Sequence, residues 1–554
     1  PRLSADGLLG NFLDLATGRR LGPLASDVER EALEDALGAP KADAVWKALV
    51  GKGWIEPRRD GREAAVVRAP GYGWEHFNGP LEPFQDHDTR RKIMEILDGR
   101  VVMVVFIDNA NLSSSLARCL GALRGPALRD DPEAREVARK LETFLDAQAN
   151  GYARLYDPKA GQFYFGRDAT RDRLFGWHDL EGTWVTGHVD YLVNEFRGPA
   201  TFVVLRHGLP LDALRNLGFK MKPYRGADGR VRHVLAPWEG SAFQGLGFEL
   251  TMTELERPSW RRLLEDFVAV EIDYSTRHGL PGFLSESYSG RGAQYTGKIG
   301  VPEVTVAPEP RITDAPSLYT LGAAYTVAPD QVEAFLAANW DKIAPLMTEH
   351  GPWEGYNTTT GDPILFQTSA HTFSLILGLL GTASDHMKAY LESRDLGPDL
   401  DEVFRPGAGA DLLRGPARVF AWDAPANPLT SESDADGFHV RSAETAHPGI
   451  AFVARDPHGV DLSGATLTLR YRLSSPATPA TIALKPAKTE TNSRGGLIPT
   501  ELFVDLAPGD DREITLQLPA TPGLRRIAEV VLTFRPEDQG EPLDLNILEL
   551  TARP

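Results

Sequence analysis

The segment Thr466-Leu467-Thr468-Leu469-Arg470-Tyr471-Arg472-Leu473 alternates polar and apolar side chains almost without interruption. A period of two is typical of a β-strand with one buried and one solvated face. Similar segments flank it, separated by Pro, Gly, Asp and Ser: Gly449–Ala454, Thr481–Lys485, Glu501–Leu506, Glu513–Leu518, Ala528–Thr533 and Leu543–Leu550. This pattern predicts an antiparallel β-sandwich over residues 414–554.

The preceding region, residues 71–400, changes to helical spacing. Asp131 before Pro132 and Ser259 after Pro258 are helix-start signals ahead of amphipathic runs. Many helices without alternating strands exclude Rossmann and TIM-barrel folds and predict an array of helix pairs. The predicted helices are Thr89–Leu97, Ala110–Leu123, Pro132–Ala149, Gly187–Arg197, Pro199–Arg206, Ser241–Leu255, Ser259–Arg277, Ser317–Tyr325, Pro329–Ile343, Ser369–Leu380 and Ser384–Ser393.

Residues 1–70 predict a small appendage, and Gly397–Gly415 predicts a linker before the sandwich. Asp27–Leu37 and Ala42–Val50 have helical spacing, and Gly53–Glu56 with Ala64–Arg68 form a hairpin pattern. Two helices and a hairpin indicate a winged-helix-like unit. Since basic residues are few here against an acidic background, a structural role is favoured over DNA binding.

Composition limits the partners of the chain. Its 554 residues are 42% apolar and 25% charged, the balance of a globular protein with two or three domains. A net charge of −18 repels phosphate backbones and anionic lipids, which disfavours nucleic acid and membrane surfaces as partners. A neutral oligo- or polysaccharide carries no such penalty. No apolar run approaches the length of a membrane span.

The sequence implies no cofactor and no metal. The single Cys119 cannot form an intrachain disulfide or a multi-cysteine zinc site. P-loop, dinucleotide-binding and Gly-x-Ser-x-Gly motifs do not occur. The chain begins at Pro1 without a methionine, which suggests either a trimmed chain or a removed leader. We expect a periplasmic or secreted protein, with the cytoplasm as the alternative.

Acids and aromatic residues gather in short segments of the middle region. Glycoside hydrolysis needs one carboxyl that protonates the leaving oxygen and a second that activates water or attacks the sugar. Aromatic rings stack on sugar faces, and a tryptophan beside an acid raises the pKa of that carboxyl. Each acid alone also fits a helix cap or a turn. The segments are Phe106–Leu112, Trp177–Trp184, Pro237–Gln244, Phe283–Tyr288 and Gly351–Asn357.

The order of these motifs resembles the glycoamylase-like family and its relatives. These include the glycoside hydrolases of family 144 and the cyclization domain of cyclic β-1,2-glucan synthases. The matching segments span about residues 100–395: Ile107–Leu112, Arg154–Asp157, Asp190–Arg197, Trp238–Gln244, Ser285–Tyr288 and Trp353–Asn357. The resemblance implies an (α/α)6 toroid, which would precede the β-sandwich that the alternating pattern predicts. It also implies activity on β-glucans, with β-1,2-linked glucan first.

The resemblance makes Glu286 the general acid and either Glu354 or Glu195 the base. Glu239 and Glu181 are further catalytic candidates that depend on their tryptophan neighbours alone. Residues expected to bind substrate are Asp108, Asn109, Asp179, Trp184, Asp190, Trp238, Gln244, Tyr288, Trp353, Tyr356, Asn357 and Asp362.

Two positions depart from the family pattern. Gln244 and Asn357 stand where the family has Glu and Asp, and neither amide can relay a proton. Asp362 is a candidate displaced substitute for the second acid.

The sequence therefore predicts a glycoside hydrolase, with inversion favoured over retention. The alternatives are a transglycosylase on the same scaffold, a non-catalytic glycan-binding protein, and a uronate lyase. Gln244 and Asn357 motivate the glycan-binding alternative. Tyr288, Arg291, Tyr295 and Lys298, which lie close together in sequence, motivate the lyase. The sandwich braces the catalytic domain or binds glycan, and its scarcity of tryptophan favours bracing.

Overall fold

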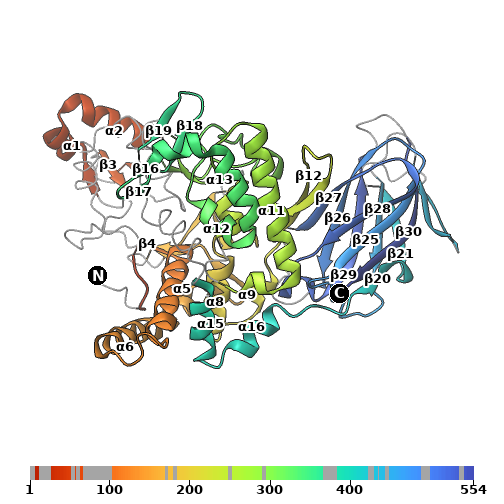
Figure 1. Ribbon diagram of the computed structural model, residues 1–554, viewed down its shortest axis with the longest axis horizontal. Helices are drawn as coiled ribbons and strands as arrows, with labels where there is room; N and C mark the ends of the chain where they lie inside the picture. The colour runs from red at the N-terminus through yellow and green to blue at the C-terminus, as the bar shows by residue number, and fades with distance from the viewer. Residues whose placement is uncertain are drawn as a thin grey trace. The chain divides into compact units, whose positions relative to one another are not determined.

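The computed structural model (Figure 1) describes residues 6–10, 27–51, 56–57, 63–66, 103–168, 173–178, 184–247, 252–289, 295–365, 383–421, 429–434, 436–442, 448–487, 499–535 and 542–554. The chain divides into two compact units. Unit 1 comprises Pro1–Val189, Phe202–Leu209 and Ser287–Thr296, and unit 2 comprises Asp190–Thr201, Pro210–Glu286 and Gly297–Pro554. Within the described ranges, none of the helices combines the length and hydropathy that a membrane span requires.

The N-terminal part of unit 1 contains the predicted helices and hairpin. Helices α1 (Arg30–Leu37) and α2 (Ala39–Gly51) precede strands β2 (Glu56–Pro57) and β3 (Glu63–Val66). The start of the first predicted helix is instead strand β1 (Asp27–Glu29), which pairs with β3 to give the sheet order β1-β3-β2.

The rest of unit 1 joins helices to short strands. Helix α6 (Pro132–Ala147) begins as predicted, because Asp131 accepts hydrogen bonds from the N–H groups of Glu133 at 2.7 Å and Ala134 at 3.0 Å. Its neighbours are α5 (Phe106–Leu123) and α7 (Ala149–Leu155). The strands are β4 (Met103–Val105), β5 (Tyr156–Asp157), β6 (Gln162–Tyr164), β7 (Gly166–Asp168), β8 (Arg173–Leu174), β9 (Gly176–His178), β10 (Trp184–Thr186), β11 (His188–Val189), β14 (Ser287–Tyr288) and β15 (Tyr295–Thr296). The expectation that the middle region lacks strands was therefore wrong; the strands of unit 1 have two or three residues each and are too short to show a period.

The predicted helix Gly187–Arg197 is also wrong. Strand β11 pairs with β6, and the chain then continues as turns until α8 (Arg197–His207) begins. Gly218 donates to the C=O of Asp190 at 2.9 Å and accepts from the N–H of Leu192 at 2.8 Å. These backbone groups are therefore unable to form helical bonds.

Unit 2 contains most of the helices that follow. Predicted helices are confirmed at α11 (Pro258–Arg277), α12 (Thr320–Val327), α13 (Pro329–Ile343) and α15 (Ala383–Glu392). The predicted helix Ser241–Leu255 is too long, since α10 (Ala242–Leu246) ends at Gly247. Shorter helices are α9 (Asp212–Arg215), η2 (Glu254–Glu256), η3 (Pro302–Val304) and η4 (Ala344–Leu346). Thr89–Leu97 and Ser369–Leu380 lie outside the described residues, and the toroid stays a prediction.

All seven predicted strands of the sandwich are present; they are drawn in blue in Figure 1 and are divided between two sheets. The seven-stranded sheet has the order β13-β12-β27-β26-β29-β24-β21. The six-stranded sheet has the order β22-β23-β30-β25-β28, and its sixth strand, β20 (Ala410–Asp411), pairs with β30 outside this order. Their bounds are β21 (Ala417–Ala421), β22 (Thr430–Asp434), β23 (Gly437–Arg441), β24 (Pro448–Val453), β25 (Thr466–Leu473), β26 (Thr478–Pro486), β27 (Thr500–Leu506), β28 (Gly509–Gln517), β29 (Ile527–Phe534) and β30 (Asp544–Arg553).

Two strands of the larger sheet come from the helical region and were not predicted. These are β12 (Lys220–Arg225) and β13 (Val231–Leu235), which form an antiparallel hairpin. Strand β12 pairs in parallel with β27, as Figure 1 shows. Lys220 also forms an ion pair of 3.1 Å with Glu501. The helical part of unit 2 thus supplies the edge of the sandwich sheet.

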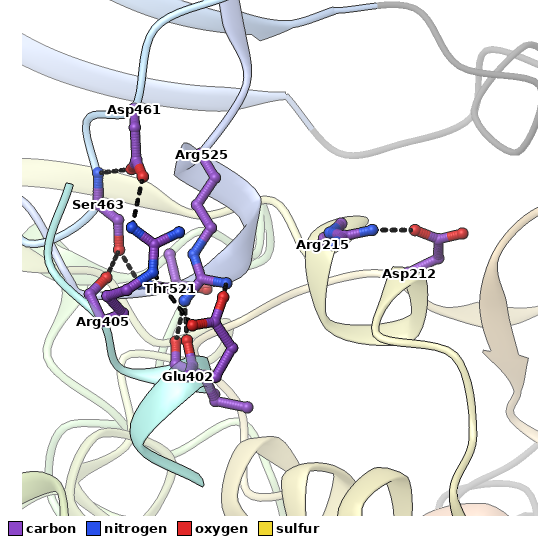
Figure 2. A network of polar contacts seen from close by, with 9 residues as sticks. Asp212, Arg215, Glu402, Arg405, Asp461, Ser463, Thr521 and Arg525 are labelled. Carbon is purple, nitrogen blue, oxygen red and sulfur yellow. Dashed lines mark hydrogen bonds and ion pairs between the residues drawn. The ribbon is translucent and has the colours of Figure 1, made fainter. Parts of the chain in front are cut away.

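The predicted linker Gly397–Gly415 is largely ordered structure. It contains α16 (Gly397–Val403), β20 (Ala410–Asp411) and η5 (Leu412–Arg414). Figure 2 shows how polar contacts hold this segment to the sandwich. Arg525 forms an ion pair of 2.8 Å with Glu402, and Ser463 donates to the C=O of Arg405 at 3.0 Å. Ser463 also accepts from the N–H of Thr521 at 3.0 Å.

A second joint of unit 2 is a buried ion pair. Arg197 and Glu254 are 3% and 1% exposed and form two parallel hydrogen bonds of 2.8 Å. The Arg197 guanidinium lies 4.4 Å from the centre of the Trp260 ring. The indole N–H of Trp260 donates to the C=O of Ala520 at 2.8 Å, next to the sandwich. Helix and sandwich are therefore joined through one chain of desolvated contacts.

We expect Glu254→Gln to lower the free energy of unfolding by about 3 kcal/mol, because it leaves a buried guanidinium without a charged partner. The matched control is Glu256→Gln, which breaks an exposed ion pair of 3.2 Å with Lys388 and should cost less than about 0.5 kcal/mol. Urea unfolding of both variants measures the difference. Equal losses would contradict the assignment of Arg197–Glu254 as the joint.

Candidate active site

Three chain segments of unit 2 pair side by side and bring two of the predicted acids close to one tyrosine. Phe283 and Ser317 exchange backbone hydrogen bonds of 3.1 and 2.9 Å. Ser317 also bridges Gly355 on its other side, and Leu318 donates to the C=O of Glu354 at 3.0 Å. The segments carrying Glu286 and Glu354 therefore flank the segment that carries Tyr319.

A closed ring of hydrogen bonds holds the backbone of Glu286. The Glu286 N–H donates to the Ser241 hydroxyl at 3.2 Å, and the Tyr319 hydroxyl donates to the Glu286 C=O at 2.9 Å. Ser285 lies between them, 3.1 Å from Ser241 and 2.6 Å from Tyr319. Since each hydroxyl has one proton, the donors run from Ser241 to Ser285 to Tyr319.

The ring is buried, with Ser241 and Ser285 at 0% and Tyr319 at 3% exposed. The Phe243 N–H also donates to Ser285 at 3.0 Å. Buried polar groups that are fully hydrogen-bonded fix one conformation, because any other leaves a group unsatisfied. The position of Glu286 is therefore well defined.

The pKa of Tyr319 responds to the carboxylates around it. Burial raises the pKa of its phenol well above the usual range, and the negative charges of Glu286, Glu354 and Glu195 raise it further. Of the five predicted catalytic residues, these three are near enough for their charges to act on the Tyr319 phenol. Glu354 is 5% exposed, whereas Glu195 and Glu286 are partly exposed.

Glu195 also acts on Tyr319, although the helix predicted to carry Glu195 does not form. Its segment is held by the N–H of Trp238, which donates to the C=O of Val193 at 3.3 Å. Tyr191 packs edge-to-face on Trp238, with ring centres 5.4 Å apart. The partly exposed Trp238 is therefore placed close to the segment that ends in Glu195.

Glu239 has a different environment from the other acids. Its carboxylate forms an ion pair with Arg311, whose side chain is 1% exposed. A buried guanidinium favours the ionised carboxylate, so Glu239 is poorly suited to donate a proton. Gln244, which is 5% exposed, accepts the Glu239 N–H at 2.9 Å. The amide at this departure from the family pattern therefore braces the Glu239 loop.

Asp190, one of the predicted substrate-binding residues, has a raised pKa and can therefore donate a proton. Burial raises the pKa of its carboxyl to about 7. Its backbone C=O accepts from Gly218 at 2.9 Å, which fixes the residue in unit 2. Near neutral pH an aspartic acid of this kind is protonated in about half of the molecules.

Asn357 caps a turn and does not replace an acid. Its side-chain oxygen accepts the N–H groups of Thr359 and Thr360, both at 3.0 Å. Strands β18 (Gly355–Asn357) and β19 (Asp362–Ile364) place exposed Asp362 opposite Asn357. Trp353 and Tyr356 are partly exposed in the same region, which also holds β16 (Met347–Thr348) and β17 (Gly351–Pro352).

The same hairpin occurs in unit 1, a local repeat that the sequence analysis missed. Asp157 accepts the N–H groups of Lys159 at 2.9 Å and Ala160 at 3.3 Å, and opposes Gln162 across β5 and β6. Each turn closes on a glycine with positive φ, 62° at Gly161 and 80° at Gly361. Asn357 therefore fills a position where Asp157 serves the same capping purpose.

The remaining candidates lie in unit 1 or outside the described residues. Asn109 is 2% exposed, donates to the C=O of Val105 and Leu9, and accepts the Leu9 N–H, so its amide holds the chain itself. Asp108 is exposed in the first turn of α5, and Tyr288 pairs with Tyr295. Trp184 lies in β10, paired with β9. Asp179 and Glu181 lie outside the described residues.

The sequence reasoning missed Tyr319, Ser241, Ser285 and Arg311 as parts of the site. Ser241 and Ser285 stand inside the motifs quoted above, next to the acids. Tyr319 and Arg311 carry no local signal, because their partners lie far away in the chain. In the part of the chain that the structure describes, no cluster of three or more His, Cys, Asp or Glu side chains is arranged to bind a metal ion.

Tyr319→Phe should lower the free energy of unfolding by about 1–2 kcal/mol, because the Glu286 C=O and the Ser285 hydroxyl lose a buried partner. Tyr325→Phe is the control, since the Tyr325 hydroxyl donates a solvent-exposed hydrogen bond of 3.0 Å to Glu333. Denaturant unfolding compares the two variants. A loss no larger than that of Tyr325→Phe would contradict the ring.

Asp190→Asn tests the raised pKa of this carboxyl. A folded-state pKa near 7, above the unfolded value near 4, gives stability that is present at low pH and lost as the pH rises toward 7. The parent should therefore lose on the order of 2 kcal/mol relative to Asp190→Asn between pH 4 and pH 8. Thermal unfolding across that range measures it, with exposed Asp341→Asn as the control. A difference that does not change with pH would refute the assignment.

Comparison with known proteins gives distant structural similarities. No protein-family model and no curated protein matches the chain. An endo-β-1,2-glucanase from Talaromyces funiculosus in complex with sophorose has a TM-score of 0.46 and 14% identity, covering 72% of this chain and 84% of that one. An endo-β-1,2-glucanase from Chitinophaga pinensis has a TM-score of 0.39 and 10% identity over 52% and 70%. A family 11 carbohydrate-binding module from Clostridium thermocellum has a TM-score of 0.20 and 11% identity over 27% and 96%. These TM-scores all lie below 0.5, so the site residues carry the functional argument.

Proposed function

We propose that this protein is a glycoside hydrolase that cleaves β-glucan, with β-1,2-linked glucan as the first choice of substrate. The observation that carries the proposal is that the segments of Glu286 and Glu354 pair with the two sides of the Tyr319 segment. The charges of Glu286, Glu354 and Glu195 all raise the pKa of the Tyr319 phenol. Cleavage of a glycosidic bond needs two carboxyl groups that flank it, one as the acid and one as the base or nucleophile. The motif order of the middle region supports the β-glucan assignment.

Glu286 is the proposed general acid. A proton donor must hold a fixed position against the leaving oxygen, and the ring of Ser241, Ser285 and Tyr319 fixes Glu286 at both its N–H and its C=O. Asp190, with a pKa of about 7, is the alternative donor.

Glu195 is the proposed base, ahead of Glu354. A base that activates water must reach solvent, and Glu195 is partly exposed whereas Glu354 is 5% exposed. Attack by water from the side opposite the leaving group gives inversion. Trp238, also partly exposed, supplies an aromatic face for a sugar ring, and the sandwich serves to brace the catalytic part.

Product release from a panel of neutral and acidic glycans tests the function. We expect the parent to release neutral oligosaccharides from linear or cyclic β-1,2-glucan. Glu286→Gln and Glu195→Gln should each lower kcat by about 10²–10⁴-fold, because each removes one proton-transfer group. The control is Glu349→Gln, at a side chain that is 85% exposed, which should keep the parent's kcat.

The other outcomes reassign the roles or end the proposal. If Glu286→Gln keeps its activity while Asp190→Asn loses it, the proton donor is Asp190. If Glu195→Gln is active and Glu354→Gln is not, Glu354 is the base. Longer products instead of shorter ones identify a transglycosylase. Binding of a glycan without any cleavage identifies a glycan-binding protein, and an unsaturated product from a uronate identifies a lyase.

A further inference from the structure

A cavity lies between the segment that follows α9 and the larger sheet of the sandwich. Its volume is about 650 Å³, and all of its lining residues belong to unit 2. This volume is within the range of pockets that bind small molecules. None of the described residues predicted for catalysis or substrate binding lines the cavity, so it is distinct from the candidate active site.

Small side chains of two neighbouring strands form the floor of the cavity. Thr481 and Ala483 share one face of β26, and the residues opposite them on β29 are Thr533 and Val531. The threonine hydroxyls donate and accept hydrogen bonds, and the methyl groups offer apolar contacts. A sugar ring uses both, because it carries hydroxyls at its edge and C–H groups on its faces. The floor therefore suits a carbohydrate.

Backbone hydrogen bonds hold the opposite wall, which ends at Gly218. Gly218 donates to the C=O of Asp190 at 2.9 Å and accepts from the N–H of Leu192 at 2.8 Å. The Glu501 N–H donates to the C=O of Phe219 at 3.0 Å, which joins this wall to β27. Since both walls consist of hydrogen-bonded backbone, the cavity is preformed, and little ordering accompanies binding.

Cations lie at both ends of the floor. Lys485 continues the face of Ala483 toward the end of β26, and Arg535 continues the face of Thr533 just after β29. The Arg535 N–H donates to the C=O of Pro479 at 3.3 Å, so Arg535 lies beside the start of β26. Six residues of strand separate Pro479 from Lys485, a distance of about 20 Å. The cavity is therefore elongated.

The charges of the lining favour an anionic ligand. Arg215 is its third cation, with 42% of the side chain exposed beside an ion pair of 3.0 Å with Asp212 (Figure 2). The carboxylate of the lining is Glu501, whose charge is balanced by an ion pair of 3.1 Å with Lys220. The excess of cations contrasts with the net charge of −18 of the whole chain. Such a local excess attracts anions.

The two cations at the ends are available to a ligand. Lys485 and Arg535 are exposed, and neither side chain forms an ion pair or a hydrogen bond within the part of the chain that the structure describes. A guanidinium binds a carboxylate through two parallel hydrogen bonds, and an ammonium binds it as a point charge.

We propose that this cavity binds an acidic oligosaccharide, which lies along β26 and β29 with carboxylates at Lys485 and Arg535. The floor around Ala483 receives the sugar rings between these two contacts. The sandwich thus binds a glycan in addition to bracing the catalytic part. The site does not rest on the proposed function, because its lining residues take no part in cleavage.

Calorimetric titration of the full chain with three probes tests the ligand class. The probes are tetragalacturonate, the neutral maltotetraose and the single sugar galacturonate. We expect tetragalacturonate to bind at least about tenfold more tightly than maltotetraose, because only the acidic chain forms charge-assisted hydrogen bonds. Galacturonate should also bind about tenfold more weakly, since it reaches one end of the cavity at a time.

Variants of the two end cations locate the site. Lys485→Gln and Arg535→Gln should each weaken tetragalacturonate binding about tenfold, because each removes one charged contact. The matched control is Arg472→Gln, at an exposed cation of β25 in the other sheet, which should keep the parent's affinity. Ala483→Phe places a large side chain on the floor and should abolish binding.

Protection of lysines from acetylation, read by mass spectrometry, gives an independent location. Tetragalacturonate should protect Lys485 and leave Lys140 reactive, a side chain of α6 that is 67% exposed. If Ala483→Phe does not fold, the two variants at exposed cations and the acetylation pattern decide.

Three results overturn the proposal. The first is maltotetraose binding as tightly as tetragalacturonate. The second is the parent's affinity in both Lys485→Gln and Arg535→Gln, or an equal loss in Arg472→Gln. The third is equal protection of Lys485 and Lys140. All of these readouts measure binding without cleavage, so a protein that cleaves no glucan but binds tetragalacturonate as expected refutes the proposed function alone.

Discussion

The closed ring of hydrogen bonds through Ser241, Ser285 and Tyr319 is the interaction on which the candidate active site depends. It uses only backbone groups of Glu286, so it sets the position of that residue independently of the state of its carboxyl. In a buried setting each missing bond would leave a polar group unsatisfied, which makes the arrangement all or none. The charges of Glu354 and Glu195, which lie on other loops, act on the same tyrosine.

The different surroundings of the acids give them different chemistry. Glu239 forms an ion pair with a buried guanidinium, burial raises the pKa of Asp190, and the charges of Glu286, Glu354 and Glu195 act on the Tyr319 phenol. Carboxyl groups in unlike environments are what acid–base chemistry at one pH requires. The amides of Gln244 and Asn357 serve the loops in which they stand, and therefore no longer argue against an enzyme.

Local patterns predicted much of this structure, and distant pairings account for the rest. The alternation in Thr466–Leu473 identified β25, and Asp131 identified the start of α6, because both signals act over a few residues. The motif order predicted that Glu195, Glu286 and Glu354 share a site, and this stays a prediction. The helix expected at Gly187–Arg197 failed because Gly218 takes its backbone bonds. Tyr319 and Arg311 were missed because nothing near them in sequence marks their partners.

The pairing of β12 with β27 has a consequence for how the chain is assembled. Met221 must pair with Leu502 before the larger sheet is complete. Contacts between residues so far apart in the sequence slow folding. Until then β27 is an open edge, available to other chains. A sandwich expressed without residues 220–235 would keep that edge permanently. Division of unit 2 at its apparent linker would therefore yield fragments that tend to associate.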